Sequence, residues 1–240
     1  MYNCDSGFKS FSGTFEVITV LFDIDGTLLR SCGAGNLAIR RAMNELFGVR
    51  DPIEVSVHGR TDTSIFGDLF AGHQLAFHEH RTSFEKKYWG FLAPALSESN
   101  ARLLPGVNDL IKKIDSHPHI AQGILTGNSK QAAKIKLAHF QLDHFFKFGG
   151  YGDLHANRDD VASLALESAG SWIGFQFEAD DVWVVGDTVH DVTCAQSIGA
   201  NAIAVATGGA SKEELASANP DMLLDDLSDT EGFVNSLLSW

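Results

Sequence analysis

The chain has 240 residues, 44% of them hydrophobic and 20% charged, which suits one large α/β domain or a domain that carries a smaller one. Its 18 Lys and Arg face 31 Asp and Glu, so the formal net charge is −13 and the protein repels phosphate backbones and anionic lipids. We therefore expect neither nucleic acid nor a membrane among its partners.

The cysteines Cys4, Cys32 and Cys194 are an odd number without the spacing of metal ligands. Neither a disulfide framework nor a zinc site is indicated, and a reducing compartment fits best. The segment 1–16 lacks the basic start and apolar stretch of a secretory signal, and no apolar run approaches the roughly 18 residues that cross a membrane. The expectation is a cytoplasmic protein with a loose N-terminus.

Short apolar runs bounded by turn residues recur along the chain, and helical stretches separate the later ones. They lie at Val17–Phe22, Ile120–Leu125, Val182–Val185 and Ala202–Val205. A helix is expected over Pro105–Ser116, with a proline near its start and apolar residues at helical spacing. This alternation predicts an α/β fold with a Rossmann-like parallel sheet.

The segment between the first strand and Pro105 shows no convincing strand. Helical periodicity covers residues 34–48 and 83–98, so the segment is expected to form an inserted helical cap. Candidate hinges lie at Ser31–Gly33 and Ser97–Arg102. The expected domains are an α/β core of residues 1–31 and 100–240 and a helical cap of residues 32–99.

Two acids, Asp23 and Asp25, end the first buried strand in "DIDGTLL". The carboxyl ends of strands in an open α/β sheet form the ligand crevice, which explains acids at that place. Gly26 and Thr27 break the strand and are expected to bring backbone N–H groups close to a ligand. Two carboxylates so near each other need a cation between them or a proton on one of them.

The next strand ends carry matching chemistry. "ILTGNSK" places the Thr126 hydroxyl and the flexible Gly127 before a helix N-terminus, which suits an anion. "VWVVGDTVHDVTCAQSIGA" places Asp187 and Asp191 one helical turn apart. Carboxylates and a hydroxyl at neighbouring strand ends predict a hard cation with oxygen ligands, most naturally Mg²⁺, and a phosphate opposite it.

Together, "DIDGTLL", "LTGNS" and "VVGDTVHDVTCAQSIGA" resemble motifs I, II and IV of the haloacid dehalogenase-like hydrolase superfamily, in its phosphoglycolate-phosphatase-like branch. The resemblance spans about Val17 to Val205, and the insertion lies where that family carries a helical cap, between motifs I and II. It implies a Rossmann-like core with a cap, and a phosphatase that uses an aspartyl-phosphate intermediate.

The resemblance also implies residue roles. Asp23 attacks phosphorus and Asp25 acts as general acid and then as general base. Asp23, the main-chain carbonyl of Asp25 and Asp187 hold Mg²⁺, with Asp191 in a supporting role, and Thr126 binds phosphate oxygens. The residues Gly26, Thr27, Gly127 and Asn128 are expected to contact the substrate. The second aspartate argues against dehalogenation, because a halide leaves without a proton.

Motif III departs from the commonest family pattern, since "GGYGDLHANRDD" offers no lysine. Arg158 stands before an expected helix at Asp160–Ala169 and is the leading candidate for the missing cation, with Lys147 as its competitor. In the cap, "VHGRTD" resembles the loop that reaches over the site, so His58 and Arg60 are expected to contact the substrate.

Simpler interpretations stay open for some of these residues. Asp191 also fits a helix cap and Arg60 a surface salt bridge, while His190 is expected to be a loop residue rather than a base. The leading function is an Mg²⁺-dependent phosphatase of a small-molecule phosphate ester, acting as a monomer or weak homodimer. The alternatives are a sugar phosphomutase on the same scaffold, with His58 and Arg60 as its cap groups, and a non-catalytic binding protein.

Overall fold

The computed structural model describes residues 17–153, 155–174 and 178–240. The expectations for the N-terminal segment 1–16 and for Cys4 lie outside these residues. Six parallel strands form the main sheet in the order β5-β4-β1-β6-β7-β8. They are β1 (Ile18–Phe22), β4 (Ile120–Thr126), β5 (Gly149–Tyr151), β6 (Val182–Gly186), β7 (Asn201–Val205) and β8 (Met222–Leu224).

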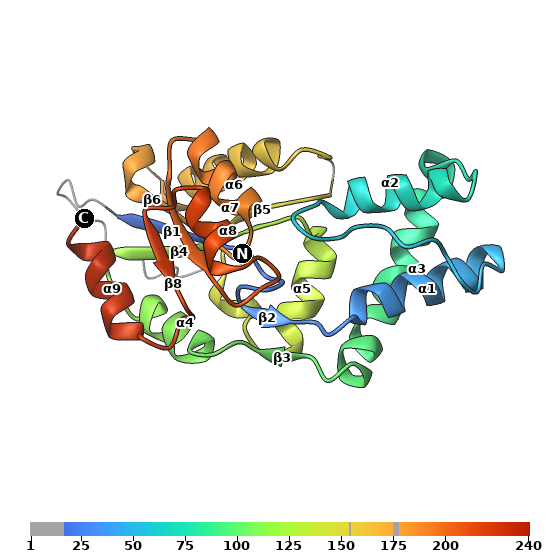
Figure 1. Ribbon diagram of the computed structural model, residues 1–240, viewed down its shortest axis with the longest axis horizontal. Helices are drawn as coiled ribbons and strands as arrows, with labels where there is room; N and C mark the ends of the chain where they lie inside the picture. The colour runs from blue at the N-terminus through green and yellow to red at the C-terminus, as the bar shows by residue number, and fades with distance from the viewer. Residues whose placement is uncertain (1–16, 154, 175–177) are drawn as a thin grey trace, which may run out of the picture.

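Helices cover both faces of this sheet, which confirms the α/β, Rossmann-like prediction (Figure 1). They are α4 (Val107–Asp115), α5 (Lys130–His139), α6 (Arg158–Ile173), α7 (Val189–Ser197), α8 (Lys212–Ser217) and α9 (Thr230–Leu238), with the short 3₁₀ helices η1 (Asp143–Phe145) and η2 (Ala179–Asp181). No helix in the described part of the chain is long and apolar enough to span a membrane.

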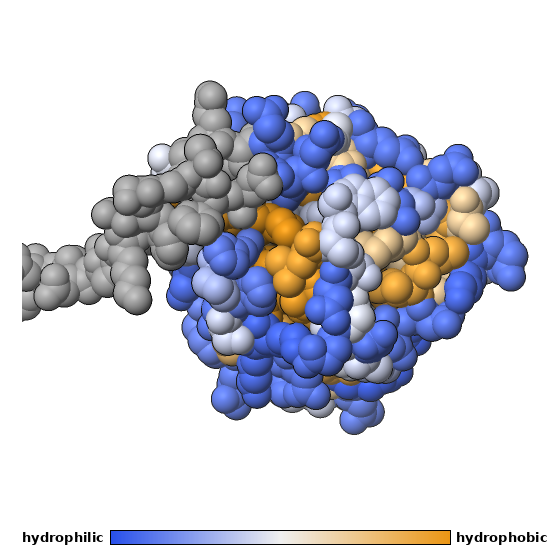
Figure 2. All heavy atoms as spheres, turned by 90° about the vertical axis from the view of Figure 1, so that its left-hand side faces the viewer, coloured by the Kyte–Doolittle hydropathy of each residue, from blue (hydrophilic) through white to orange (hydrophobic). Residues whose placement is uncertain are grey.

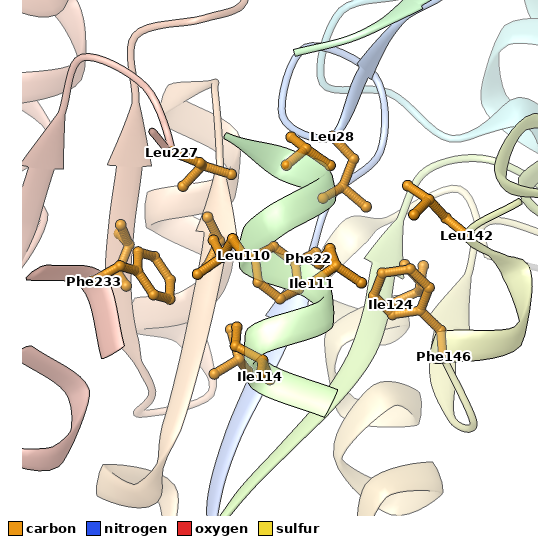
Figure 3. Close-up of a cluster of buried hydrophobic side chains, with 14 of the residues drawn as sticks. Phe22, Leu28, Leu110, Ile111, Ile114, Ile124, Leu142, Phe146, Leu227 and Phe233 are labelled. Atoms are coloured by element: carbon orange, nitrogen blue, oxygen red, sulfur yellow. The ribbon is translucent and has the colours of Figure 1, made fainter. Parts of the chain in front are cut away.

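Each face of the sheet has its own hydrophobic core. Phe22 and Ile124 point to one face, where Leu110 of α4 and Phe233 of α9 pack against them (Figure 3). The other face packs against α6, α7 and α8. Strands buried on both sides read as near-continuous apolar runs, which is why β1, β4, β6 and β7 were recognisable in the sequence.

The helices α1 (Ala34–Phe47), α2 (Asp62–Gly72) and α3 (Phe77–Glu98) build a separate core, at the right in Figure 1. Phe66, Phe70, Phe84 and Tyr88 form its centre, with ring centroids 5.0 to 6.5 Å apart. These three helices therefore share an aromatic core separate from the two cores of the sheet, with Ala132 of α5 packed into it.

A two-stranded antiparallel ladder, β2 (Leu29–Arg30) and β3 (Arg102–Leu103), lies where the chain leaves and re-enters the sheet domain. The sequence did not predict it, because two-residue strands carry no periodicity. The strands β5 and β8 were not predicted for the same reason, as each has only three residues.

The end of the core opposite the cap is mostly hydrophilic, with a hydrophobic band across it (Figure 2).

Candidate active site

A cavity of about 470 Å³ opens between the carboxyl ends of the central strands and the cap. Most of the predicted site residues line it. From the sheet domain come Asp23, Asp25, Gly26, Thr126, Gly127, Asn128, Arg158 and Asp187; from the cap come His58 and Arg60. Chain segments far apart in the sequence thus converge where the parallel strands end, as the topology requires.

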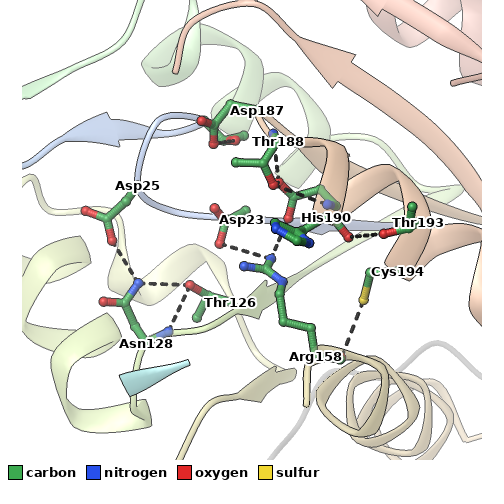
Figure 4. A network of polar contacts seen from close by, with 12 residues as sticks. Asp23, Asp25, Thr126, Asn128, Arg158, Asp187, Thr188, His190, Thr193 and Cys194 are labelled. Carbon is green, nitrogen blue, oxygen red and sulfur yellow. Dashed lines mark hydrogen bonds and ion pairs between the residues drawn. The ribbon is translucent and has the colours of Figure 1, made fainter. Parts of the chain in front are cut away.

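Three buried carboxylates gather at one side of this cavity. Asp23, Asp187 and Asp191 each offer an oxygen within 4.8 Å of the others. The Arg158 guanidinium bonds the Asp191 carboxylate and lies 3.7 Å from an Asp23 oxygen (Figure 4). Lys147 is exposed and donates to the His144 carbonyl instead. The structure therefore brings Arg158, and not Lys147, to the predicted nucleophile.

Asp23, Asp187 and Asp191, here called the Asp23 cluster, carry more negative charge than the Arg158 guanidinium neutralises. Burial and the neighbouring Asp191 raise the pKa of Asp23 to about 7. Burial and Asp23 raise the pKa of Asp187 to about 8. A site of buried oxygen ligands with surplus negative charge fits a hard divalent cation, because the cation relieves the repulsion that these raised pKa values express.

Asp191 also holds the start of α7 in place. Its Oδ2 accepts from the Thr188 backbone N–H at 3.0 Å and from the Thr188 hydroxyl at 2.7 Å, while its own N–H donates to the Thr188 hydroxyl oxygen. This is a capping box. The capping interpretation and the place beside Asp23 therefore hold together, since one carboxylate serves both.

Gly26 and Thr27 lie differently from the expectation. The Gly26 N–H donates to the Leu29 carbonyl at 2.8 Å, so the turn itself uses this donor. Gly26 has a φ of 91°, and a Cβ there would collide with the Asp187 carboxylate. The Thr27 hydroxyl is buried and faces Asp187 at 3.2 Å. Gly26 thus makes room for Asp187 and also lines the cavity, while the Thr27 hydroxyl orients Asp187.

Asp25 belongs to a second network on the other side of the cavity. Its Oδ2 accepts from Lys136 Nζ at 2.5 Å and from Asn128 Nδ2 at 2.8 Å, and its Oδ1 accepts from the Ser31 hydroxyl. Burial alone would raise the pKa of Asp25, but the Lys136 ammonium and these hydrogen bonds hold it below its usual value. The two acids of "DIDG" therefore sit in opposite electrostatic environments (Figure 4).

Lys136 was absent from the sequence expectations, although a signal for it existed. In α5 it shares the buried face with Ala132, Ala133 and Leu137. A lysine at an apolar position of a helix that follows a motif-bearing strand is unusual, because lysine is almost never fully buried unless paired. Asp62 and Ser31 were missed as well, since neither follows a strand of the main sheet.

The expected phosphate-binding loop is ordered by its own side chains. The Thr126 hydroxyl oxygen accepts from the Asn128 backbone N–H at 3.3 Å and from Asn128 Nδ2 at 2.9 Å. With both lone pairs used, its hydrogen is the group left to donate. Asn128 itself is held by Lys136 Nζ on its Oδ1 at 2.6 Å. Thr126 is thus prepared to donate a hydrogen bond to an anion.

The cap meets this loop directly. The Asp62 N–H donates to the Gly127 carbonyl at 2.7 Å, and Asp62 Oδ2 accepts from the Ser129 N–H at 2.8 Å. A Cβ on Gly127 would collide with the Arg60 carbonyl, so Gly127 permits the approach of the cap. Burial raises the pKa of Asp62 to about 6. Gly127 therefore serves cap contact as well as lining the cavity.

The cap residues His58 and Arg60 differ in their freedom. The Arg60 guanidinium is bound to Asp68 at 2.6 Å and to Ser64, which ties it to α2. His58 is exposed at the cavity and lies near Gly209. His190 is exposed in the first turn of α7 and meets Gly59 of the cap. Arg60 is thus engaged within the cap, whereas His58 remains at the cavity wall.

Known proteins resemble this chain over most of its length. A phosphoglycolate phosphatase of Synechococcus elongatus is 29% identical, covering 91% of this chain and 98% of the relative. The pyrophosphatase PpaX of Bacillus cereus is 24% identical, covering 89% and 94%. The structure of CbbY from Rhodobacter sphaeroides with phosphate shares the fold with a TM-score of 0.69 at 20% identity, covering 89% and 96%.

The family model described as haloacid dehalogenase-like hydrolase matches residues 20–205. The match includes all three strand ends that build the cavity, as well as the inserted cap. It agrees with the motifs read from the sequence, and the named relatives agree with the phosphoglycolate-phosphatase-like branch. The protein therefore belongs to the haloacid dehalogenase-like hydrolase family and is an enzyme of the hydrolase class.

Proposed function

We propose that this protein is an Mg²⁺-dependent phosphatase of a small-molecule phosphate ester. The observation that carries the proposal is the separation of two carboxylates in one cavity. Asp23 is buried beside Arg158 and two further acids, and Asp25 is held apart by Lys136. Nucleophilic attack and proton transfer need two carboxyl groups with different surroundings. Without a cation the pKa of Asp23 is raised and that of Asp25 is lowered, and a bound cation would return Asp23 to the ionised form that attacks.

In the first half of the reaction, an Asp23 oxygen attacks phosphorus and the bond from phosphorus to the ester oxygen breaks. Asp25 has to carry a proton at that stage, against the lowering of its pKa by Lys136 in the free protein, and it gives that proton to the departing oxygen. In the second half, a water attacks the phosphorus of the aspartyl phosphate and gives its proton to Asp25. The bond to Asp23 then breaks, which releases phosphate and restores both carboxyl groups.

Arg158 and Thr126 assist by charge and by hydrogen bonding. The Arg158 guanidinium neutralises the negative charge that gathers at Asp23 and at the transferring phosphoryl group. The Thr126 hydroxyl donates to a phosphate oxygen. Asp23 and Asp187, with Asp191 beside them and the Asp25 carbonyl expected as a further ligand, would hold Mg²⁺, which would supply Lewis-acid stabilisation of the phosphate charge.

The substrate is expected to be small, because the cavity of about 470 Å³ must hold both the phosphate and the rest of the ester. The names of the relatives suggest phosphoglycolate and pyrophosphate for a first panel. The free cysteines Cys32 and Cys194 favour a cytoplasmic location. The acidic composition argues against nucleic-acid and membrane partners. We propose a monomer or weak homodimer.

The test is phosphate release from a panel that includes 2-phosphoglycolate, pyrophosphate and hexose phosphates, with Mg²⁺ and with EDTA. Mg²⁺-dependent release is the expected result. Conversion of a hexose 1-phosphate to its 6-phosphate without phosphate release would instead identify a mutase. The salt bridge between Arg60 and Asp68 argues against a mutase, because Arg60 is one of the two cap groups that a mutase would use. Folded protein without turnover on any substrate would identify a binding protein.

A further inference from the structure

Lys136 is a buried lysine in the middle of the candidate site, with an exposed fraction of 4%. Burying an ammonium group costs several kcal/mol unless it is well paired, and an apolar side chain would fit the rest of this helix face at lower cost. The neighbours on that face, Ala132, Ala133 and Leu137, are all apolar. The fold of α5 therefore does not explain the lysine.

The contacts of Lys136 are directed at one carboxylate. Its Nζ lies 2.5 Å from Asp25 Oδ2 and 2.6 Å from Asn128 Oδ1. Asn128 Nδ2 donates to the same Asp25 oxygen at 2.8 Å. The Ser31 hydroxyl holds the other oxygen of Asp25. Both oxygens of this carboxylate are therefore restrained, and Lys136 supplies the charged contact that also fixes Asn128.

This network joins the proton-transfer group to the phosphate-binding loop. Asn128 Nδ2 also donates to the Thr126 hydroxyl oxygen at 2.9 Å. Lys136, Asn128 and Asp25 thus form a connected set with Thr126, carried by α5 and the loop before it. A general acid must lie within hydrogen-bond reach of the atom it protonates, so a change in the direction of Asp25 weakens proton transfer.

We propose that Lys136 is a positioning residue for Asp25. It holds the Asp25 carboxyl group at the angle from which Asp25 protonates the ester oxygen, and through Asn128 it sets the distance from that carboxyl group to Thr126. The inference rests on the proposed phosphatase function. Lys136 itself neither attacks phosphorus nor binds the cation.

The main experiment compares Lys136→Met with Lys134→Met, an exposed lysine on the same helix that serves as the matched control. For each variant, kcat/KM is measured with 4-nitrophenyl phosphate, whose leaving group departs without a proton, and with an alkyl phosphate, whose leaving oxygen must be protonated. We expect Lys136→Met to lower kcat/KM for the alkyl ester about a hundredfold, which is the low end of a general acid's contribution. The loss in kcat/KM for the aryl ester should be smaller than this by a factor of at least about ten.

Two further comparisons separate positioning from damage to the fold. Lys136→Arg keeps the charge and is expected to recover part of the alkyl-ester activity. In an Asp25→Asn background, Lys136→Met is expected to add no further loss on the alkyl ester, because residues that act as a unit are not additive. Equal losses on both esters, or multiplying losses in the double variant, would overturn the proposal.

Failure of the proposed function is recognised separately, by a wild-type protein that hydrolyses neither ester. The crystal structure of Lys136→Met then decides the inference without turnover. A carboxyl group of Asp25 that rotates away from Asn128 supports positioning by Lys136, and one that keeps its contacts with Ser31 and Asn128 overturns it. If Lys136→Met does not fold, Lys136→Gln takes its place in both measurements.

Discussion

The two sides of the cavity handle buried acids in contrasting ways. In the Asp23 cluster, three carboxylates share one guanidinium, and the pKa values of Asp23 and Asp187 rise to about 7 and about 8, mainly through burial. On the other side, Asp25 forms an ion pair with Lys136 at 2.5 Å, and the pKa of Asp25 falls below its usual value. Both acids end the same strand, so the difference comes entirely from the neighbours that the fold supplies.

The contrast teaches which positive charges the chain provides and which it leaves to a ligand. On the Asp25 side the chain supplies its own positive charge, the Lys136 ammonium, together with the hydrogen bonds from Ser31 and Asn128. The Asp23 cluster carries an excess of negative charge that a divalent cation would neutralise. The proposed reaction would use this asymmetry, because its nucleophile meets an anionic phosphate while its proton-transfer group pairs with a lysine.

The largest expected effect comes from Asp23→Asn, which removes the nucleophile while keeping the volume of the side chain. Turnover should fall by at least about a thousandfold, since loss of a nucleophile removes the covalent route itself. The measurement is phosphate release under saturating Mg²⁺, with a thermal melt to show that the variant is folded. Wild-type activity in this variant would remove Asp23 from its assigned role.

Arg158→Ala tests whether catalysis needs the single guanidinium of the Asp23 cluster. Truncating one partner of a buried, hydrogen-bonded charge pair costs about 2 to 5 kcal/mol, and we expect a loss of that size in transition-state stabilisation. Lys147→Ala is the matched control, because Lys147 is exposed and bonds only to the His144 carbonyl. The contrary result would be an unchanged kcat/KM for Arg158→Ala.

Asp187→Asn is expected to stabilise the metal-free protein. A folded-state pKa raised to about 8 means that stability falls as pH rises from about 4 to 8, because the folded state binds the proton more tightly than the unfolded chain. At pH 7 we expect a gain of about 4 kcal/mol, since pH 7 lies about 3 units above the usual pKa of 3.8 and each unit is about 1.4 kcal/mol. Wild type should gain stability on addition of Mg²⁺, and the variant should lose most of that gain.

Thermal melts of both proteins with EDTA and with Mg²⁺ check this expectation. A variant that is less stable than wild type in EDTA would show that the repulsion in the Asp23 cluster is small. The Thr27 hydroxyl, which faces Asp187 at 3.2 Å, remains able to bond an asparagine oxygen, so the substitution removes charge and little else.

The sequence predicted much of the Asp23 cluster because strand ends are readable. Buried apolar runs located β1, β4, β6 and β7, and the acids that follow β1 and β6 meet since parallel strands end at one edge. Arg158 was also recognised, as a cation before a helix. The positions of these residues follow from local sequence pattern and from strand topology, and both can be inferred from a single sequence.

The Asp25 side was not predictable in the same way. Lys136 acts from the second turn of α5, and Asp62 reaches the Ser129 N–H from the cap. Their roles depend on how helices pack in three dimensions, which a linear pattern does not contain. The sequence also did not show that the Gly26 N–H donates to the Leu29 carbonyl, because such turn bonds are seen only in the structure; the expected substrate contacts of Gly26 and Thr27 stay predictions.

The smallest expected effect concerns Asp62, which faces the same ammonium as Asp25 but does not bond it. Its pKa is raised to about 6, mainly by burial, with Lys136 opposing and Asp25 adding to the rise. For an acid with a raised folded pKa, stability falls as pH rises from about 4 to 6. In Asp62→Asn this decline should flatten, with a gain of about 3 kcal/mol at pH 7, because the pKa difference is about 2 units and each unit is about 1.4 kcal/mol.

Urea unfolding at several pH values between 4 and 7, under saturating Mg²⁺, isolates this contribution from the Asp23 cluster. Asp51→Asn, at an exposed cap position, is the control and should leave the pH dependence as it is in wild type. A steeper decline in Asp62→Asn would mean that the bond from the Ser129 N–H outweighs the cost of burying the charge. Lys136 would then stabilise the cap carboxylate nearly as well as it stabilises Asp25, and the contrast between the two acids would rest on hydrogen bonds rather than on charge.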